Sequence, residues 1–196
     1  VFFSNFVDQR LYRIPPNAEA QAVTSESKFR YADGIVDRRR NRFICVREDH
    51  SVSGQEALTT LVAIDLTSGE QQILASGNDF YSSPRLSADG NQLSWLQWNH
   101  PNMPWDGSEL WLADVQEDGS LTNKTLIADG DSESVFQPEW SPGGELYFVS
   151  DRSDWWNLYR RRAGKIEAVC TMNAEFGLPQ WVFGMSTYGF VSAKQI

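Results

Sequence analysis

A short strand–turn–strand phrase recurs along the chain and constrains the fold more than any other feature of the sequence. In its clearest copy, Asp89-Gly90 forms the turn and an apolar run ending at Trp98 follows it. Glycine supplies the positive φ that such a tight hairpin turn requires. A second clear copy and two weaker ones follow the same pattern, and Asp33-Gly34 stands at the place of the turn in one weak copy. The four copies occupy residues 83–98, 137–150, 31–46 and 178–192.

The spacing of these copies, about 40 to 50 residues, is typical of the blades of a β-propeller. Two more short segments follow each of three hairpins, so that these repeats have four expected strands each. The third strands are expected at 61–66, 110–115 and 157–161, and the fourth strands at 71–75, 124–128 and 165–169. The run 146–149 is apolar on both faces, as a sheet packed between two other sheets requires. We therefore predict an all-β, TolB- or WD40-like β-propeller made of four-stranded antiparallel sheets.

The same repeat gives the expected blade limits. We predict one propeller domain over residues 1–196, with blades at 28–76, 77–130 and 131–173 and partial blades at 1–27 and 174–196. Because the first and last units lack strands, we expect a propeller fragment of about four blades, incomplete at both ends, that belongs to a longer chain. Open strand edges pair readily with other chains, so self-association through the blade edges is also expected.

The composition excludes several classes of partner. A net charge of −9 disfavours nucleic acid, because phosphate binding requires a basic face. The only basic cluster, four arginines within residues 38–42, falls in a predicted hairpin turn and is interpreted as a solvated turn. No apolar stretch approaches the roughly 20 residues of a membrane span, so we predict no membrane partner. Cys45 and Cys170 form no disulfide framework, which indicates a reducing compartment and predicts a cytoplasmic location.

The chain carries no recognisable catalytic motif. A Gly-x-Ser-x-Gly nucleophile elbow, a Gly-rich phosphate loop and a Cys-x-x-Cys pair are all absent from the sequence. His50 and His100 are the only histidines, and neither has ligand-like spacing to a partner. We therefore predict no catalytic residue, no metal site and no cofactor on this chain.

The segment 98–111 is unusually rich in large and restricted residues for a connection between strands. It contains two prolines, three tryptophans, one histidine and two carboxylates, whereas a simple hairpin uses about two to five polar residues. One interpretation is that the indole rings pack on the blade edge and Asp106 caps a turn. The other interpretation is a loop that faces a ligand or another domain, because function concentrates on loops held by a rigid scaffold.

Two further candidates lie in the fourth repeat and just after it. Asp151-Arg152 stands at the place that segment 98–111 occupies in the previous repeat, and we interpret it as a structural turn and ion pair. Glu175 lies in a connection between blades. Its carboxylate is either solvated or, near the mouth of a propeller, available to a substrate amine.

Segment 98–111 also carries a family resemblance. It resembles the Trp-x-His-Pro-x-Met-Pro-Trp-Asp-x-x-Glu-Leu motif of the acylaminoacyl-peptidase and dipeptidyl-aminopeptidase-like branch of the prolyl oligopeptidase family of serine peptidases, and segments 144–152, 156–159 and 174–176 resemble the same branch. The resemblance implies a β-propeller that caps an α/β-hydrolase domain. In that family the hydrolase domain carries the catalytic Ser, Asp and His, while the propeller restricts access and helps to hold the N-terminal part of the substrate. The hydrolase half is absent from this sequence, so no catalytic residue is transferred.

The resemblance implies that this propeller gates and positions peptide substrates for an α/β-hydrolase domain, and its partners would be the peptide and that domain. The candidate substrate- or domain-facing residues are His100, Trp105, Asp106, Glu109 and Glu175. The alternative is a TolB- or WD40-like protein-interaction propeller with no peptidase domain. A glycan-active propeller would require two carboxylates that face each other across a pocket, whereas Asp106 and Glu109 lie on one short loop.

Overall fold

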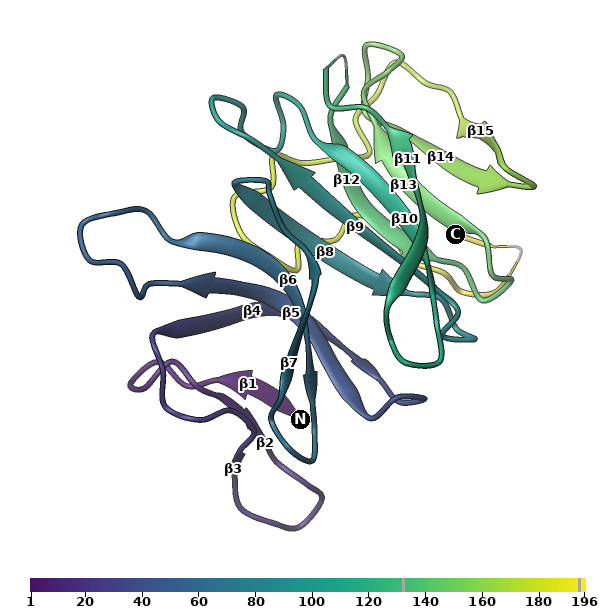
Figure 1. Ribbon diagram of the computed structural model, residues 1–196. Coiled ribbons are helices and arrows are strands. Elements are labelled where there is room, and N and C mark those ends of the chain that lie inside the picture. The colour runs from purple at the N-terminus through teal and green to yellow at the C-terminus, as the bar shows by residue number, and fades with distance from the viewer. Residues whose placement is uncertain (132, 194) are drawn as a thin grey trace. The chain divides into compact units, whose positions relative to one another are not determined.

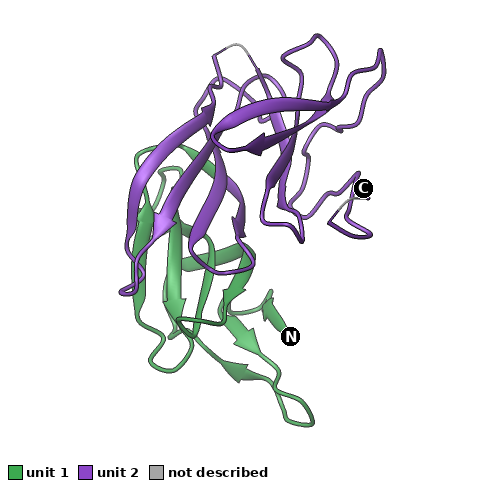
Figure 2. Cartoon of the chain, turned by 90° about the vertical axis from the view of Figure 1, so that its right-hand side faces the viewer, with its two compact units in different colours: residues 1–81 green, residues 82–196 purple. Residues whose placement is uncertain are grey.

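The computed structural model describes residues 1–131, 133–193 and 195–196, and within these ranges the chain forms strands, turns and loops only. None of the described residues belongs to a helix long and apolar enough to cross a membrane. The strands form four antiparallel sheets (Figure 1). The chain divides into two compact units, residues 1–81 and 82–196 (Figure 2).

Unit 1 contains two sheets, with strand orders β1-β2-β3 and β4-β5-β6-β7. Their strands are β1 (Phe2–Ser4), β2 (Leu11–Arg13), β3 (Gln21–Ala22), β4 (Phe29–Asp37), β5 (Arg42–Asp49), β6 (Leu58–Asp65) and β7 (Gln71–Ala75). Both sheets contribute to one apolar cluster, in which Phe2 of β1 stacks on Phe43 of β5 with ring centroids 5.0 Å apart. Burial of this cluster stabilises the packing of the two sheets within the unit.

Unit 2 contains two four-stranded sheets, ordered β8-β9-β10-β11 and β12-β13-β14-β15. Their strands are β8 (Phe80–Leu86), β9 (Gln92–Trp98), β10 (Glu109–Val115), β11 (Leu121–Ala128), β12 (Val135–Trp140), β13 (Leu146–Ser150), β14 (Asn157–Arg162) and β15 (Lys165–Cys170). The first two residues of β8 lie in unit 1. Each expected third and fourth strand of these repeats is present, so the predicted all-β fold with four-stranded antiparallel blades is confirmed.

Strand β13 is buried on both faces, as its unbroken apolar sequence predicts. Leu146 and Phe148 pack into a cluster shared with the preceding sheet. Tyr147 and Val149, on the opposite face, pack against side chains of the segment that follows β15, including Phe176 and Tyr188. The sheet of β12–β15 is therefore enclosed by a sheet on one side and by a loop segment on the other.

The predicted turn at Asp89-Gly90 is confirmed in detail. Gly90 has a φ of 72°, and Asp89 accepts hydrogen bonds from the Ser87 hydroxyl at 2.6 Å and from the amide of Asn91 at 3.1 Å. A carboxylate that accepts from groups on both sides of it stabilises the turn locally. This turn connects β8 to β9.

The structure corrects the expectation at Asp33-Gly34. These residues lie inside β4 rather than in a turn, at a register shift between Ala32 and Ile35 where Asp33 has a φ of 46°. The glycine is required there for a different reason, because a Cβ on Gly34 would lie 2.2 Å from the ring of Phe43. The hairpin turn is formed instead by residues 38–41, as predicted for the basic cluster. The cluster is solvated only in part, because Arg42 is buried in β5 and the side chains of Arg40 and Arg42 both pair with Asp37.

The expected strands of a fifth unit also differ from the structure. The described residues after β15 form only one isolated bridge, between Ser192 and Gln195. A strand requires a neighbouring strand for its hydrogen bonds, and this segment instead packs side chains on β12–β14. The assignment of residues 1–196 to one propeller domain with the stated blade limits stays a prediction.

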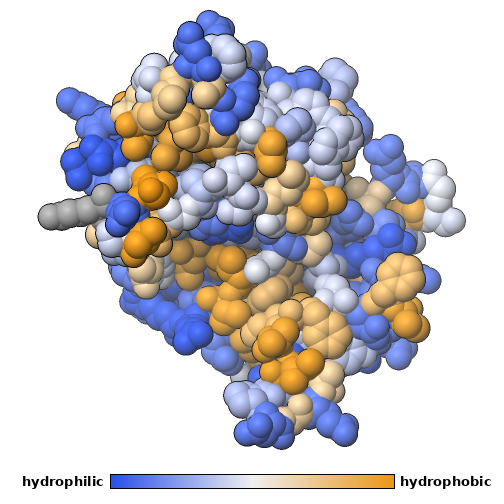
Figure 3. Space-filling model, turned by 180° about the vertical axis from the view of Figure 1, so that it is seen from behind, coloured by the Kyte–Doolittle hydropathy of each residue, from blue (hydrophilic) through white to orange (hydrophobic). Residues whose placement is uncertain are grey.

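Apolar side chains reach the surface in this last segment. Trp181 is 71% exposed and Val182 is 66% exposed, and Leu178 and Phe183 are also exposed. Figure 3 shows apolar residues gathered in clusters between hydrophilic areas on one face of the molecule. Of these residues, Leu178 lines the pocket described below and Trp181 contacts another residue of its lining, Trp105.

Candidate functional site

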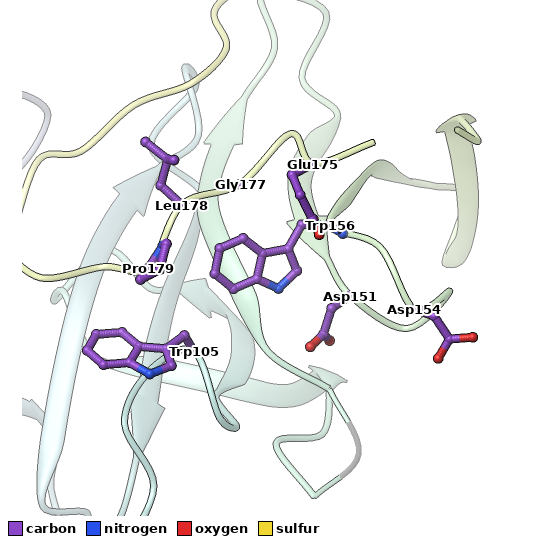
Figure 4. A pocket seen from close by; sticks show the side chains of 8 residues that line it. All are labelled: Trp105, Asp151, Asp154, Trp156, Glu175, Gly177, Leu178 and Pro179. Carbon is purple, nitrogen blue, oxygen red and sulfur yellow. Dashed lines mark hydrogen bonds between the residues drawn. The ribbon is translucent and has the colours of Figure 1, made fainter. Parts of the chain in front are cut away.

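A pocket of about 440 Å³ lies in unit 2 at the ends of several strands (Figure 4). We refer to it as the acidic pocket. Its lining residues are Trp105, Asp151, Asp154, Trp156, Glu175, Gly177, Leu178 and Pro179. They come from the β9–β10 loop, the β13–β14 loop with the residue before β14, and residues 171–190, which we call the wall segment. The volume is in the range that accommodates small ligands or the end of a peptide.

The β13–β14 loop brings Asp151 and Asp154 to the pocket. The Asp151 carboxylate accepts hydrogen bonds from the amide of Ser134 at 2.7 Å and from its hydroxyl at 3.2 Å. The amide of Asp154 donates to the carbonyl of Asp151 at 2.8 Å, and Asp154 has a φ of 67° that aspartate tolerates better than most residues. Its exposed carboxylate makes no hydrogen bond or ion pair with the described residues.

Trp156 forms the centre of the pocket and is held from two sides. Its indole NH donates to the Ser134 hydroxyl at 2.7 Å, and its ring stacks nearly parallel to Phe136 with centroids 6.3 Å apart. The amide of Trp156 donates to the Glu175 carboxylate at 2.7 Å, and its carbonyl accepts from the amide of Phe176 at 2.7 Å. These contacts bring Glu175 into the pocket beside the indole (Figure 4).

Trp105 closes another side of the pocket. It is half-buried, and its ring lies against Trp181 of the wall segment with centroids 4.4 Å apart and planes inclined by 48°. Figure 4 shows Trp105 beside Pro179. The acidic pocket therefore combines carboxylates with an apolar aromatic side.

The charged residues that line the pocket are all negative. Three of its described lining residues are carboxylates and none is cationic. The adjacent Arg152 is already occupied, because its guanidinium donates to both Glu133 oxygens at 2.8 and 2.9 Å. The predicted ion pair of Arg152 is thus formed, but with Glu133 rather than Asp151. The pocket offers a site to a cation, which carboxylates bind by charge-assisted hydrogen bonds and indole faces bind through their π-electrons.

The structure brings together only two of the predicted site residues in this pocket. Trp105 and Glu175 line the acidic pocket, whereas His100 and Glu109 line a smaller polar hollow of about 140 Å³ nearby in the same loop region. Asp106 lines neither, and its carboxylate accepts from the amide of Met103 at 3.0 Å. That contact is the turn cap of the structural interpretation. The functional roles of all five residues stay predictions.

The Glu109 side chain also accepts hydrogen bonds from neighbouring side chains of its own sheet. Its carboxylate accepts from the Gln97 side-chain amide at 2.8 Å and from the Trp111 indole NH at 2.6 Å. Among the described residues, no group of three or more His, Cys, Asp or Glu side chains is arranged to hold a metal ion. Neither pocket is therefore supported as a metal site.

Reasoning from the sequence did not assign Asp151, Asp154 and Trp156 to the site. The repeat contains a signal that points to them, because the β13–β14 loop occupies the same place in its blade as the β9–β10 loop. Equivalent loops of consecutive four-stranded blades emerge at the same end of the sheets. This equivalence is apparent from the sequence, but Asp151-Arg152 is interpreted there as a structural turn, and Asp154 and Trp156 are not considered as site residues.

No protein-family model and no curated protein matches the chain. Several solved structures do. A puromycin hydrolase is 34% identical, with a TM-score of 0.83 over 94% of this chain. A Mycobacterium tuberculosis puromycin-hydrolyzing peptidase is 32% identical, with a TM-score of 0.83 over 93% of this chain. The chain belongs to the prolyl oligopeptidase family of serine peptidases.

Within this family the chain corresponds to the β-propeller part. It spans 31% of the length of the puromycin hydrolase and 30% of the length of the mycobacterial peptidase. TolB from Acinetobacter baumannii is 14% identical, with a TM-score of 0.56, and the match covers 83% of this chain and 37% of the TolB chain. At this low identity the similarity supports the fold and no function.

Proposed function

We propose that this propeller positions peptide substrates for the α/β-hydrolase domain of a serine peptidase, and that its acidic pocket holds the amino-terminal end of the peptide. The acidic pocket itself carries the proposal. Its described lining combines three carboxylates with two indole rings and includes no cationic side chain. An α-ammonium group is a cation of the size and hydrogen-bonding capacity that such a lining accommodates.

Each side of the pocket has a role in this proposal. Asp151, Asp154 and Glu175 attract the ammonium group, and the Trp105–Trp181 pair offers an apolar surface to the first side chain of the peptide. Fixing the amino terminus orients the peptide bond relative to a nucleophile on another domain, and such orientation lowers the barrier without any bond chemistry in the propeller. The propeller would also restrict access of long peptides to that nucleophile.

The alternative is an interaction propeller that binds a folded protein and has no peptidase domain. The two functions differ in what they require from the ligand, because only the first depends on a free amino terminus. Acetylation of the peptide amine removes its charge and therefore separates them.

Asp154→Asn in the peptidase that carries this propeller tests the proposal. The Asp154 carboxylate makes no hydrogen bond or ion pair with the described residues, and asparagine also tolerates its positive φ, so the fold should be unaffected. An exposed ion pair contributes about 0.2–1 kcal/mol. We therefore expect KM for free-amine substrates to rise roughly 1.4- to fivefold at unchanged kcat, with no change for N-acetylated substrates.

Glu19→Gln provides the matched control, because it removes one exposed carboxylate in unit 1. We expect it to leave both KM values unchanged. Equal effects of Asp154→Asn on free-amine and acetylated substrates, or no effect on either, would contradict the proposed role of the acidic pocket.

A further inference from the structure

The wall segment supplies half of the acidic pocket without being part of a sheet. Glu175, Gly177, Leu178 and Pro179 line the pocket, yet residues 171–190 contribute no strand. Strand hydrogen bonds therefore do not hold this wall in place. Apolar packing on β12–β14 and the backbone hydrogen bond from Phe176 to Trp156 hold its middle, and side-chain hydrogen bonds from the sheet of β12–β15 hold its two ends.

The first of these contacts is made by Asn157, the first residue of β14, which is almost completely buried. Its carboxamide oxygen accepts from the amide of Met172 at 2.7 Å. Its amide nitrogen donates to the carbonyl of Met172 at 3.0 Å and to that of Ala174 at 3.4 Å. Asn157 thus fixes the backbone up to the residue before Glu175.

The second contact is made by Gln137 of β12, which is also buried and has a φ of 48° at the bulge of its strand. Its carboxamide oxygen accepts from the amide of Thr187 at 2.7 Å. Its amide nitrogen donates to the hydroxyl of Ser186 at 2.9 Å and to the carbonyl of Tyr188 at 2.8 Å. Gln137 therefore fixes the other end of the wall segment.

We propose that Asn157 and Gln137 are positioning residues for the acidic pocket, because their buried carboxamides hold the two ends of the wall segment and thereby place Glu175 and the Trp181 side of the pocket. This inference rests on the proposed function of the pocket. A carboxamide suits the task since it donates and accepts within one rigid group. A carboxylate of the same shape keeps the acceptor and loses the donor, so the wall-segment carbonyls that accept from the carboxamide lose this partner.

The test uses Asn157→Asp, with Gln137→Glu as a second variant at the other end of the segment. Hydrogen exchange is measured at the amides of Met172, Phe176 and Thr187, and calorimetry measures the affinity for phenylalaninamide well below the melting temperature. We expect exchange at the wall-segment amides to accelerate about tenfold or more and the affinity to fall about fivefold or more, since each variant removes two donated hydrogen bonds to the segment. Exchange in β13 should be unchanged.

Gln97→Glu is the matched control, because Gln97 is a buried carboxamide of unit 2 that bonds Trp95 and Glu109 rather than the wall segment. It should lower the melting temperature and leave both wall-segment exchange and affinity unchanged. If Asn157 had only a structural role, Asn157→Asp would likewise lower the melting temperature and leave the affinity for phenylalaninamide unchanged. Unchanged affinity in both wall-segment variants, or unchanged exchange in the wall segment, would overturn the inference.

The failure of this inference can be distinguished from the failure of the proposed function. If Asp154→Asn weakens phenylalaninamide binding and the two wall-segment variants do not, the inference alone is wrong. If the wild-type protein binds phenylalaninamide no better than its N-acetyl derivative, the proposed function is wrong and the inference falls with it.

Discussion

Replacing Gly177 with alanine should damage the acidic pocket through one steric contact. A Cβ at this position would lie 2.4 Å from Cε3 and 2.8 Å from Cδ2 of Trp156, well inside the distance at which carbon atoms repel. The indole cannot move aside easily, since it stacks on Phe136 and donates to the hydroxyl of Ser134. The wall segment must therefore move instead.

The magnitude follows from what this movement breaks. Overpacking of a well-packed site costs about 1–3 kcal/mol. Displacement of the wall segment also weakens the 2.7 Å hydrogen bond between the amide of Phe176 and the carbonyl of Trp156, which contributes about 1 kcal/mol. We expect a loss of roughly 2–4 kcal/mol in the free energy of unfolding. For a chain of this length each kcal/mol lowers Tm by about 2–4 °C.

Gly189→Ala is the matched control within the same segment. A Cβ on Gly189 meets no atom within 4 Å, and neither glycine has a positive φ, so the two substitutions differ only in the space around the new methyl group. Urea unfolding and thermal melting of both variants give the comparison, and Gly189→Ala should stay within about 0.5 kcal/mol of the wild type. Equal stability of the two variants would refute the packing of Gly177 on Trp156.

Two further predictions concern unit 1 and the thiols. Burial raises the pKa of Asp37, but hydrogen bonds from Arg42 and Arg40 outweigh it and hold the pKa below its usual range. Because the folded pKa is the lower one, this stabilisation is complete above the unfolded pKa and is lost as the pH falls through the folded pKa. Asp37→Asn should thus cost about 3 kcal/mol in urea unfolding at pH 7, and a difference that does not shrink in acid would contradict this origin. Burial also raises the pKa of the Cys45 thiol. A thiol reagent should therefore modify the partly exposed Cys170 in the native protein and should modify Cys45 only after unfolding. Rapid labelling of Cys45 in the native protein would contradict its burial.

The blades could be predicted from the sequence because their signals are local. The glycine-containing turn at residues 87–91 and the apolar run 146–149 each specify their own conformation, and the repeat then orders them. The turn predicted at Asp33-Gly34 was wrong because a local signal can have two causes. A glycine that is needed for close approach to Phe43 looks the same in the sequence as a glycine that is needed for a turn. The apolar pattern of 178–192 likewise resembles a strand, but a strand also requires a neighbour that the pattern cannot show.

The candidate site was only partly predictable because it is assembled from three separate segments. Trp105 and Glu175 were selected individually for their residue type and position, and their meeting in one pocket depends on how Asn157 and Trp156 hold the wall segment. The choice between a ligand and a cap at Asp106 depends on one hydrogen bond to Met103, which no sequence pattern specifies.

The binding of phenylalaninamide and of N-acetylphenylalaninamide to the wild-type protein, compared by calorimetry, tests the central claim most directly. Three carboxylates line the pocket, and at about 0.2–1 kcal/mol for each exposed ion pair their sum corresponds to about a tenfold preference for the free amine. We expect that preference at low ionic strength, and we expect it to diminish as salt screens the charges. Equal affinity for the two compounds, or a preference that is insensitive to salt, would contradict the role of the acidic pocket in holding an amino terminus.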